Sequence, residues 1–302
     1  MMKRLLIILL CIFYTSLLFA QNKSNKGKEF WTGWGHNQLS PGTGNGNCKL
    51  TLYLSADVAS NITITIPGTP FTITDLIPAG TARPYNITYT AAFLSTEGSF
   101  SNRGIHIESD QDIVAYAHQY GNTSSGATML LPVETYGYTY YSLSKNQGWS
   151  NNAGIYSWFF IVASGDNTRV EITPSQNTLG GRIAGQPFTV ILNKGDIYNV
   201  MSQSTTGDLT GSKIRSIQNP LTNTCVPIAV FSGASRTRIT NLNDGSGSNG
   251  DILMQQIFPA SAWGNRYFTA PTVASGNTSF FNYNSYRVAV RNPSTIVKRN
   301  GV

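Results

Sequence analysis

Charged residues and histidines are scarce in this sequence, and this scarcity limits the chemistry that the chain could perform. Only 12% of the residues are charged, and three of the 302 are histidine. None of these histidines lies in a zinc-protease motif or beside a nucleophile motif, and no catalytic triad or acid pair is visible. The sequence therefore predicts a protein that is not an enzyme. A hydrolase acting on polysaccharide is the minor alternative.

The few titratable residues are predicted to have structural or solvent-facing roles. His106 and His118 lie on neighbouring predicted strands, which would pair across a turn at Ser109–Asp110–Gln111 and hold the two rings well apart. His36 is likewise expected to be structural. The one acidic cluster is interpreted as a solvated turn and comprises Glu108, Asp110 and Asp112.

Basic residues are also few and scattered. The net charge of +7 is spread along the chain, without the continuous basic face that phosphate binding requires. We therefore expect no nucleic-acid partner.

The first twenty residues have the pattern of a cleaved secretory signal. Lys3 and Arg4 precede an apolar core, and Leu18-Phe19-Ala20 forms a cleavage site before Gln21. The apolar stretch is too short to span a bilayer, so no transmembrane segment is predicted. Residues 1–20 are assigned to the signal, residues 21–26 to a linker, and the protein to the cell surface or the extracellular medium.

Two cysteines remain after cleavage, Cys48 and Cys225, and an oxidising compartment would allow them to form a disulfide. No cysteine or histidine spacing indicates a zinc site. The loop Asn241–Asp251 offers oxygen ligands, including Asn243 and Asp244, but lacks the spacing of an EF-hand. We predict no cofactor, with Ca²⁺ in this loop as the alternative.

Strand-like segments follow one another at short spacing, and no helical period of useful length occurs after the signal. The chain is therefore predicted to be all-β. The expected strands in the first part of the chain are Lys49–Ser55, Asn61–Ile66, Phe71–Leu76, Gly104–Glu108, Asp112–Tyr120 and Ala127–Val133.

The segments recur, which predicts internal repeats. Asp112–His118 matches Pro227–Gly233, and the pattern after Leu131-Pro132 is echoed after Phe258-Pro259. The predicted units are residues 27–136, 137–263 and 264–302. The third is far shorter than the others, which suggests a fragment of a longer chain.

Two architectures fit such units: tandem β-sandwiches, or propeller-like blades of four-stranded antiparallel meanders. Ile113–Tyr116 and Trp158–Val162 are apolar on both faces, as expected for sheets that are covered on both sides. Propeller-like blades are therefore slightly favoured.

Aromatic residues in loops are the candidates for ligand contact. Trp31, Trp158 and Trp263 fall at repeat or strand positions and are predicted to be core. Trp34 and Trp149 lie in Gly- or Asn-rich segments, where an exposed ring could stack on a sugar. The loops 121–126 and 241–250, the latter with Asn241, Asn243 and Asp244, complete the predicted contact surface.

Several motifs together resemble the N-terminal domain of the IgGFc-binding protein family. They are Gly27-Lys28-Glu29-Phe30-Trp31, Ile113–Tyr116, Leu131-Pro132-Val133, Asp208–Ile214 and Val226–Gly233. The resemblance implies an extracellular, β-rich module at the N-terminus of large secreted or surface-displayed proteins, with adhesin-type members in gliding Gram-negative bacteria. We therefore expect a non-enzymatic adhesion module that binds a protein or a glycan. The alternative is a structural spacer.

Overall fold

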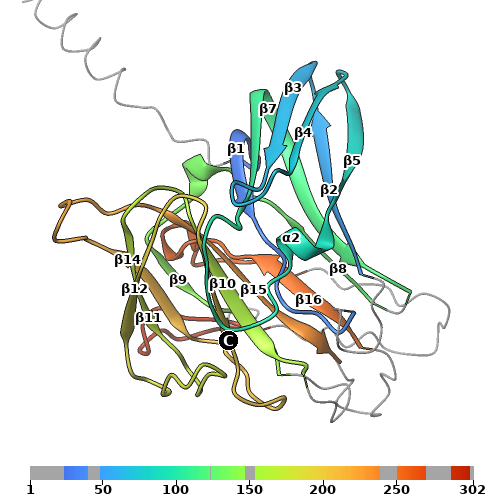
Figure 1. Cartoon of the computed structure of the whole chain (residues 1–302). Coiled ribbons are helices and arrows are strands. Elements are labelled where there is room, and N and C mark those ends of the chain that lie inside the picture. The colour runs from blue at the N-terminus through green and yellow to red at the C-terminus, as the bar shows by residue number, and fades with distance from the viewer. Residues whose placement is uncertain are drawn as a thin grey trace, which may run out of the picture.

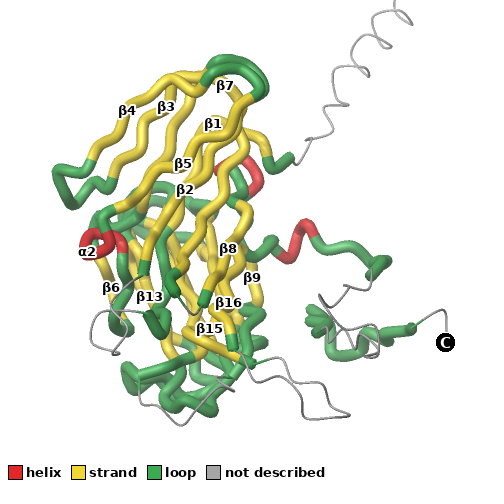
Figure 2. Tube along the Cα trace, turned by 90° about the vertical axis from the view of Figure 1, so that its right-hand side faces the viewer, coloured by secondary structure: helices red, strands yellow, loops and turns green. Residues whose placement is uncertain are grey.

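The structure is a computed structural model that describes residues 24–39, 48–122, 124–146, 154–238, 250–269 and 287–299. In these residues the regular structure is almost entirely β-strand, arranged in three sheets of antiparallel strands (Figures 1 and 2). Their helical structure is limited to α2 (Tyr89–Ala92) and two 3₁₀ turns, Val133–Thr135 and Ala260–Ala262. The all-β prediction is confirmed.

The seven-stranded sheet, here called the large sheet, is built around one long strand, β7. The first half of β7 pairs with β1 and β3, and its second half pairs with β2 and β8. The order is β4-β3-β7-β2-β5, with β1 and β8 also on β7. Its strands are β1 (Lys26–Thr32), β2 (Lys49–Ala56), β3 (Ser60–Thr65), β4 (Thr72–Ile77), β5 (Thr81–Ile87), β7 (Ile105–Tyr120) and β8 (Ser125–Met129).

The predicted turn at Ser109–Asp110–Gln111 is wrong, because β7 continues through it. The carboxylate of Asp110 accepts hydrogen bonds from the backbone N–H and the side-chain amide of Asn61 on β3, at 2.9 and 2.7 Å. These bonds to a neighbouring strand replace the local bonds that a turn would use. His106 and His118 therefore lie far apart on one strand.

The five-stranded central sheet is covered on both faces. Every residue of β10 is buried, and alternate side chains belong to two different clusters. Trp158, Phe160 and Val162 pack with the large sheet, whereas Phe159 and Ile161 pack with the four-stranded sheet. The order is β16-β15-β10-β13-β6, and the strands are β6 (Gly98–Phe100), β10 (Ser157–Ala163), β13 (Ile197–Met201), β15 (Ile228–Thr237) and β16 (Asp251–Gln256).

The four-stranded small sheet closes the other side of the central sheet. Its inward residues, such as Val170, Ile172 and Ile214, are fully buried, while its outward residues alternate with them. The order is β12-β11-β14-β9. The strands are β9 (Thr139–Tyr141), β11 (Thr168–Thr173), β12 (Phe188–Leu192) and β14 (Lys213–Ile217).

The preference for propeller-like blades is not confirmed. Sheets of seven, five and four strands stack as three layers, with the central sheet shared by both cores. β6, which precedes β7 in sequence, pairs with β13 in the central sheet. Strands from the first predicted unit therefore contribute to two different sheets.

Residues 33–39 run through the interior after β1, and all seven are buried. This segment lies against the central-sheet face that packs on the large sheet: Gly33 is close to Ile197 and Phe160, and Gly35 is close to Trp158. A Cβ atom on Gly35 would lie 2.4 Å from the Trp158 ring. Only glycine allows so close an approach.

Candidate binding surface

Trp34 is not on the surface. Its side chain is 0% exposed and belongs to the core between the large and central sheets, and its backbone carbonyl accepts a hydrogen bond from the Leu94 N–H at 3.2 Å. The prediction that Trp34 offers its ring to a ligand is therefore wrong. The glycines on either side of it, Gly33 and Gly35, allow close packing against the central sheet and do not indicate an exposed loop. The core prediction holds for Trp31 and Trp158, which are 2% and 0% exposed, but not for Trp263, which is only partly buried.

The other predicted contact residues, Trp149, Asn241, Asn243 and Asp244, lie outside the described residues. The described residues that flank their segments do, however, lie close together. The Thr237 hydroxyl donates to the Asn146 carbonyl at 2.8 Å, and the Arg236 guanidinium donates to the Gly250 carbonyl at 2.9 Å. The described residues that flank these two segments are thus joined at one group of strand ends.

The connection between β7 and β8 reaches the same end. The Ser125 N–H donates to the carboxylate of Asp251 at the start of β16. Gly126, also in β8, is so close to the Ile252 backbone that a Cβ atom would lie 2.9 Å from its carbonyl oxygen. The described residues that flank the predicted contact loops 121–126 and 241–250, and those that flank the segment with Trp149, therefore lie around one group of strand ends, which we call the loop end.

A row of buried polar residues supports the loop end from within. Asn37 donates to Gln119 at 2.9 Å, His36 lies 2.7 Å from the Ser235 hydroxyl, and Gln38 accepts from Arg236. Burying these groups is tolerated because each has a partner. The row joins the segment before residue 40 to the ends of β7 and β15.

His36 and Ser235 are the residue types of a general base and a nucleophile, but their contact is buried in the interior of the protein. His36 is 6% exposed and Ser235 is 0% exposed. Burial lowers the pKa of the His36 imidazole to about 4. The Ser235 hydroxyl also accepts the Tyr156 N–H at 2.9 Å. No substrate can reach this oxygen, so the pair can stabilise the interior but cannot attack an ester or amide.

Cys48 and Cys225 do not form the predicted disulfide, because both are free cysteines. Cys48 directly precedes β2 of the large sheet and contacts Asn37, whereas Cys225 lies beside Ser216 of the small sheet. The central sheet separates these two layers. The pairing prediction is wrong because sequence separation gives no information on which sheet each residue joins.

The predicted acidic cluster is exposed, as expected, but it occupies the middle of β7 instead of a turn. The Asp110 carboxylate is bound to Asn61, and its backbone carbonyl accepts from the Lys28 ammonium at 2.9 Å. Among the residues that the structure describes, no group of three or more His, Cys, Asp and Glu side chains could hold a metal ion. The predicted Ca²⁺ loop lies outside them, apart from Gly250 and Asp251.

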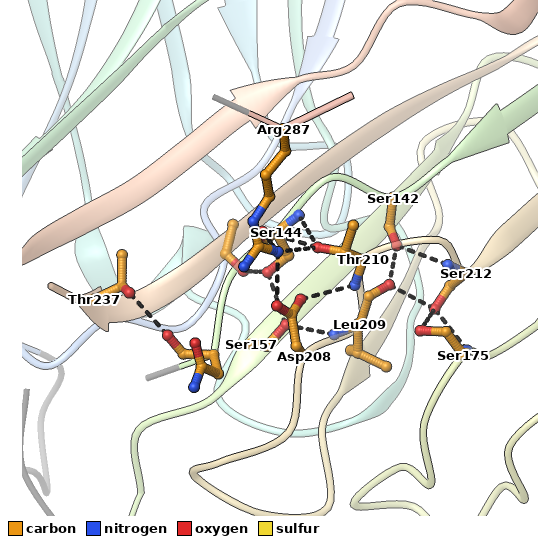
Figure 3. Close-up of polar contacts among 12 residues, drawn as sticks. Ser142, Ser144, Ser157, Ser175, Asp208, Leu209, Thr210, Ser212, Thr237 and Arg287 are labelled. Carbon is orange, nitrogen blue, oxygen red and sulfur yellow. Dashed lines mark hydrogen bonds and ion pairs between the residues drawn. The ribbon is translucent and has the colours of Figure 1, made fainter. Parts of the chain in front are cut away.

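A cluster of buried serines joins the central and small sheets (Figure 3). The Ser144 and Ser157 hydroxyls lie 2.7 Å apart, and Ser144 also donates to a backbone carbonyl. Arg287 points into the cluster and donates to the Asp208 carboxylate at 2.7 Å. The serine hydroxyls shown contact carbonyls, backbone N–H groups and one another, but no histidine or carboxylate. The cluster satisfies buried polar groups and anchors the segment that contains Arg287.

The outer face of the large sheet carries an aromatic stripe that sequence analysis missed. Tyr53 and Tyr116 are directly opposite each other on β2 and β7, and they are 37% and 42% exposed. On β7, the His118 and Tyr120 rings stack at 4.5 Å, and the Tyr53 ring lies 6.0 Å from that of His118. The signal in the sequence is an aromatic side chain at every second position, Tyr116, His118 and Tyr120.

A cavity of about 310 Å³ lies at one end of this stripe. Lys49 and Tyr120, which are paired across β2 and β7, both line it, and the Lys49 ammonium is 5.9 Å from the Tyr120 ring centroid. The lining is completed by Cys48, Leu50, Asn86 and Ile87. Together the stripe and the cavity offer flat aromatic surface, a cation and an amide.

Within the described residues, no helix is long and apolar enough to cross a membrane. No curated protein and no solved structure shows significant similarity to the chain. The family model described as IgGFc binding protein matches residues 126–302, which is more than half of the chain and includes most of the central sheet and all of the small sheet. The resemblance expected from the sequence is confirmed, and the chain belongs to the IgGFc-binding protein family.

Proposed function

We propose that the chain is a non-enzymatic binding and adhesion module at the N-terminus of a larger bacterial protein that is secreted or displayed at the cell surface. The observation that carries this proposal is the family match, because the family is one of binding domains. The enclosed contact between His36 and Ser235 agrees with a binding role, since it places the best candidate for a nucleophile beyond the reach of a substrate.

We place the protein-binding surface at the loop end. Loops held on a rigid scaffold carry ligand contacts in many binding folds. Here the scaffold is rigid because the central sheet is buried on both faces and the polar row from His36 to Gln38 fixes the strand ends. The proposed contact residues are Trp149, Asn241, Asn243 and Asp244.

An array of extracellular host proteins would test this proposal, and the Fc fragment of IgG is the first ligand to include because of the family's description. We expect at least one array protein to bind. The variant Trp149→Ala should weaken binding about tenfold, because aromatic residues often dominate interface energies. Val58→Ala is the matched control, since Val58 is an exposed apolar residue in the turn at the opposite end of β2.

Two outcomes would contradict the proposal: no array protein binds, or Trp149→Ala and Val58→Ala behave alike. The alternative function, a structural spacer, predicts that a parent protein keeps its full ligand binding after this chain is deleted. Measuring the parent with and without the chain therefore separates a recognition module from a spacer.

A further inference from the structure

The described residues that line the cavity beside Tyr120 differ in charge. Among these described residues, Lys49 provides the one charge and the others are uncharged. In the described part of the chain, no carboxylate forms an ion pair with the Lys49 ammonium. Burial raises the pKa of the Cys48 thiol to about 11, so this side chain adds no negative charge near neutral pH. The cavity is therefore electrostatically suited to an anion.

The neutral polar groups of the cavity are also available. The Thr51 hydroxyl donates to the Asn86 side-chain oxygen at 2.9 Å, which fixes the orientation of this amide. The Asn86 amide nitrogen then has no hydrogen-bond partner among the described residues. A ligand hydroxyl could accept a hydrogen bond from it without breaking any existing contact.

The aromatic wall favours a ligand with a flat apolar face. His118 stacks on Tyr120, and the His118 Nε2 atom contacts the Ser125 hydroxyl at 2.8 Å, so the ring column is held in place. Rings that are ordered before binding lose little conformational entropy in the complex. A sugar ring combines an apolar C–H face with hydroxyl groups, which matches this wall and the neighbouring amide.

We propose that this cavity binds a carboxylate-bearing sugar residue of an extracellular glycan. The sugar carboxylate accepts hydrogen bonds from the Lys49 ammonium, the sugar ring packs against Tyr120, and a ring hydroxyl accepts from the Asn86 amide. A volume of about 310 Å³ is at the lower end of the range for small-ligand sites and holds about one sugar residue. The cavity borders the loop end, because Tyr120 is the last residue of β7, but the proposal rests on other contacts than those of the protein-binding surface.

Two matched pairs of probes test the proposal by ligand-observed NMR titration of the purified protein. Trigalacturonic acid and 3′-sialyllactose are each compared with their methyl esters. At least one acid should bind, and its neutral counterpart should bind about tenfold more weakly, because a charge-assisted hydrogen bond is lost. The neutral counterparts keep sugar rings for stacking, so each comparison isolates the charge.

Variants then locate the site. Lys49→Gln should weaken the acidic sugar about tenfold, and Asn86→Ala should weaken it severalfold. Lys213→Gln is the control, because it removes the same charge from the small sheet and should leave the affinity unchanged. Circular dichroism checks that each variant is folded.

The proposal is overturned if neither acid binds, if acid and neutral probe bind equally, or if Lys213→Gln weakens binding as much as Lys49→Gln. Because these probes are isolated sugars, such a failure leaves the protein-array result unaffected. Conversely, binding of a protein alone would support the loop end without supporting the sugar cavity.

Discussion

At the scale of single residues, His36 makes a clear prediction about pH. Burial lowers the pKa of its imidazole from an ordinary 6.5 to about 4, so the folded chain binds fewer protons than the unfolded chain between these values. Stability is therefore lost as the pH falls through this window. The loss attributable to His36 should be about 3 kcal/mol between pH 7 and pH 4. Urea unfolding at several pH values measures it.

The variant His36→Gln is the control for this prediction, because glutamine retains a polar group facing Ser235 but does not titrate. Other groups also contribute to the pH dependence. Burial raises the pKa of Glu29, but hydrogen bonds from His106 and Lys194 outweigh this effect and lower it overall. The difference between the two proteins isolates His36, and equal pH dependence in both would contradict its role.

The tryptophans show when burial could be predicted from the sequence pattern and when it could not. Trp31 and Trp158 were correctly predicted as core because they lie in strand-like or repeated segments. Trp34 was misassigned because Gly33 and Gly35 resemble loop residues, whereas they are small so that the chain can pass against Phe160 and Trp158. A sequence alone does not distinguish a glycine needed for a turn from one needed for close packing.

At the scale of elements, a close contact between a glycine and a proline occurs at the start of two predicted repeat units. A Cβ atom on Gly27 would lie 2.3 Å from the Pro132 Cβ, and one on Gly137 would lie 2.5 Å from the Pro259 Cβ. Each proline precedes a 3₁₀ turn near the end of the same unit. The contact is the same at Gly27 and Gly137, which are the first residues of the first two predicted units.

The variant Gly137→Ala tests the importance of this contact. We expect it to lower the free energy of unfolding by about 2 kcal/mol, because the new methyl group overlaps a buried proline. Gly264→Ala is the matched control: the Gly264 N–H also donates to a tyrosine hydroxyl three residues later at 2.8 Å, but a Cβ atom there would meet nothing closer than 3.9 Å.

Chemical denaturation should show a loss below about 0.5 kcal/mol for Gly264→Ala. Equal losses in the two variants would mean that the contact with Pro259 is unimportant for stability.

Strand positions were largely predictable, but their partners were not. β2, β3 and β4 lie within one or two residues of their predicted ranges, because turn residues separate their apolar runs. The predicted break inside β7 failed because Asp110 bonds to Asn61 on another strand, a long-range contact that local patterns do not contain. The aromatic stripe was missed for the same reason, since it forms only when β2 and β7 pair.

At the scale of the whole molecule, the layered fold predicts one cooperative unfolding transition. β10 contributes alternate side chains to both cores, and β6 links the first predicted unit to the central sheet. Calorimetry should therefore show a single heat-absorption peak. Phe160→Ala and Ile161→Ala affect opposite faces of β10. Each should lower the free energy of unfolding by about 2–5 kcal/mol and therefore shift this peak to lower temperature. Two separate peaks, each sensitive to one variant, would contradict the prediction.

The burial of the central sheet on both faces also has a consequence for the order of folding. β6 is synthesised early but pairs with β13, and β10 needs β15, which lies much later in the chain. The middle layer therefore cannot form until most of the chain has emerged from the ribosome. Pairings between such distant segments fold slowly. The secretion that we propose for this chain would benefit from this delay, because an exported chain has to stay extended until its last strands are available on the far side of the membrane.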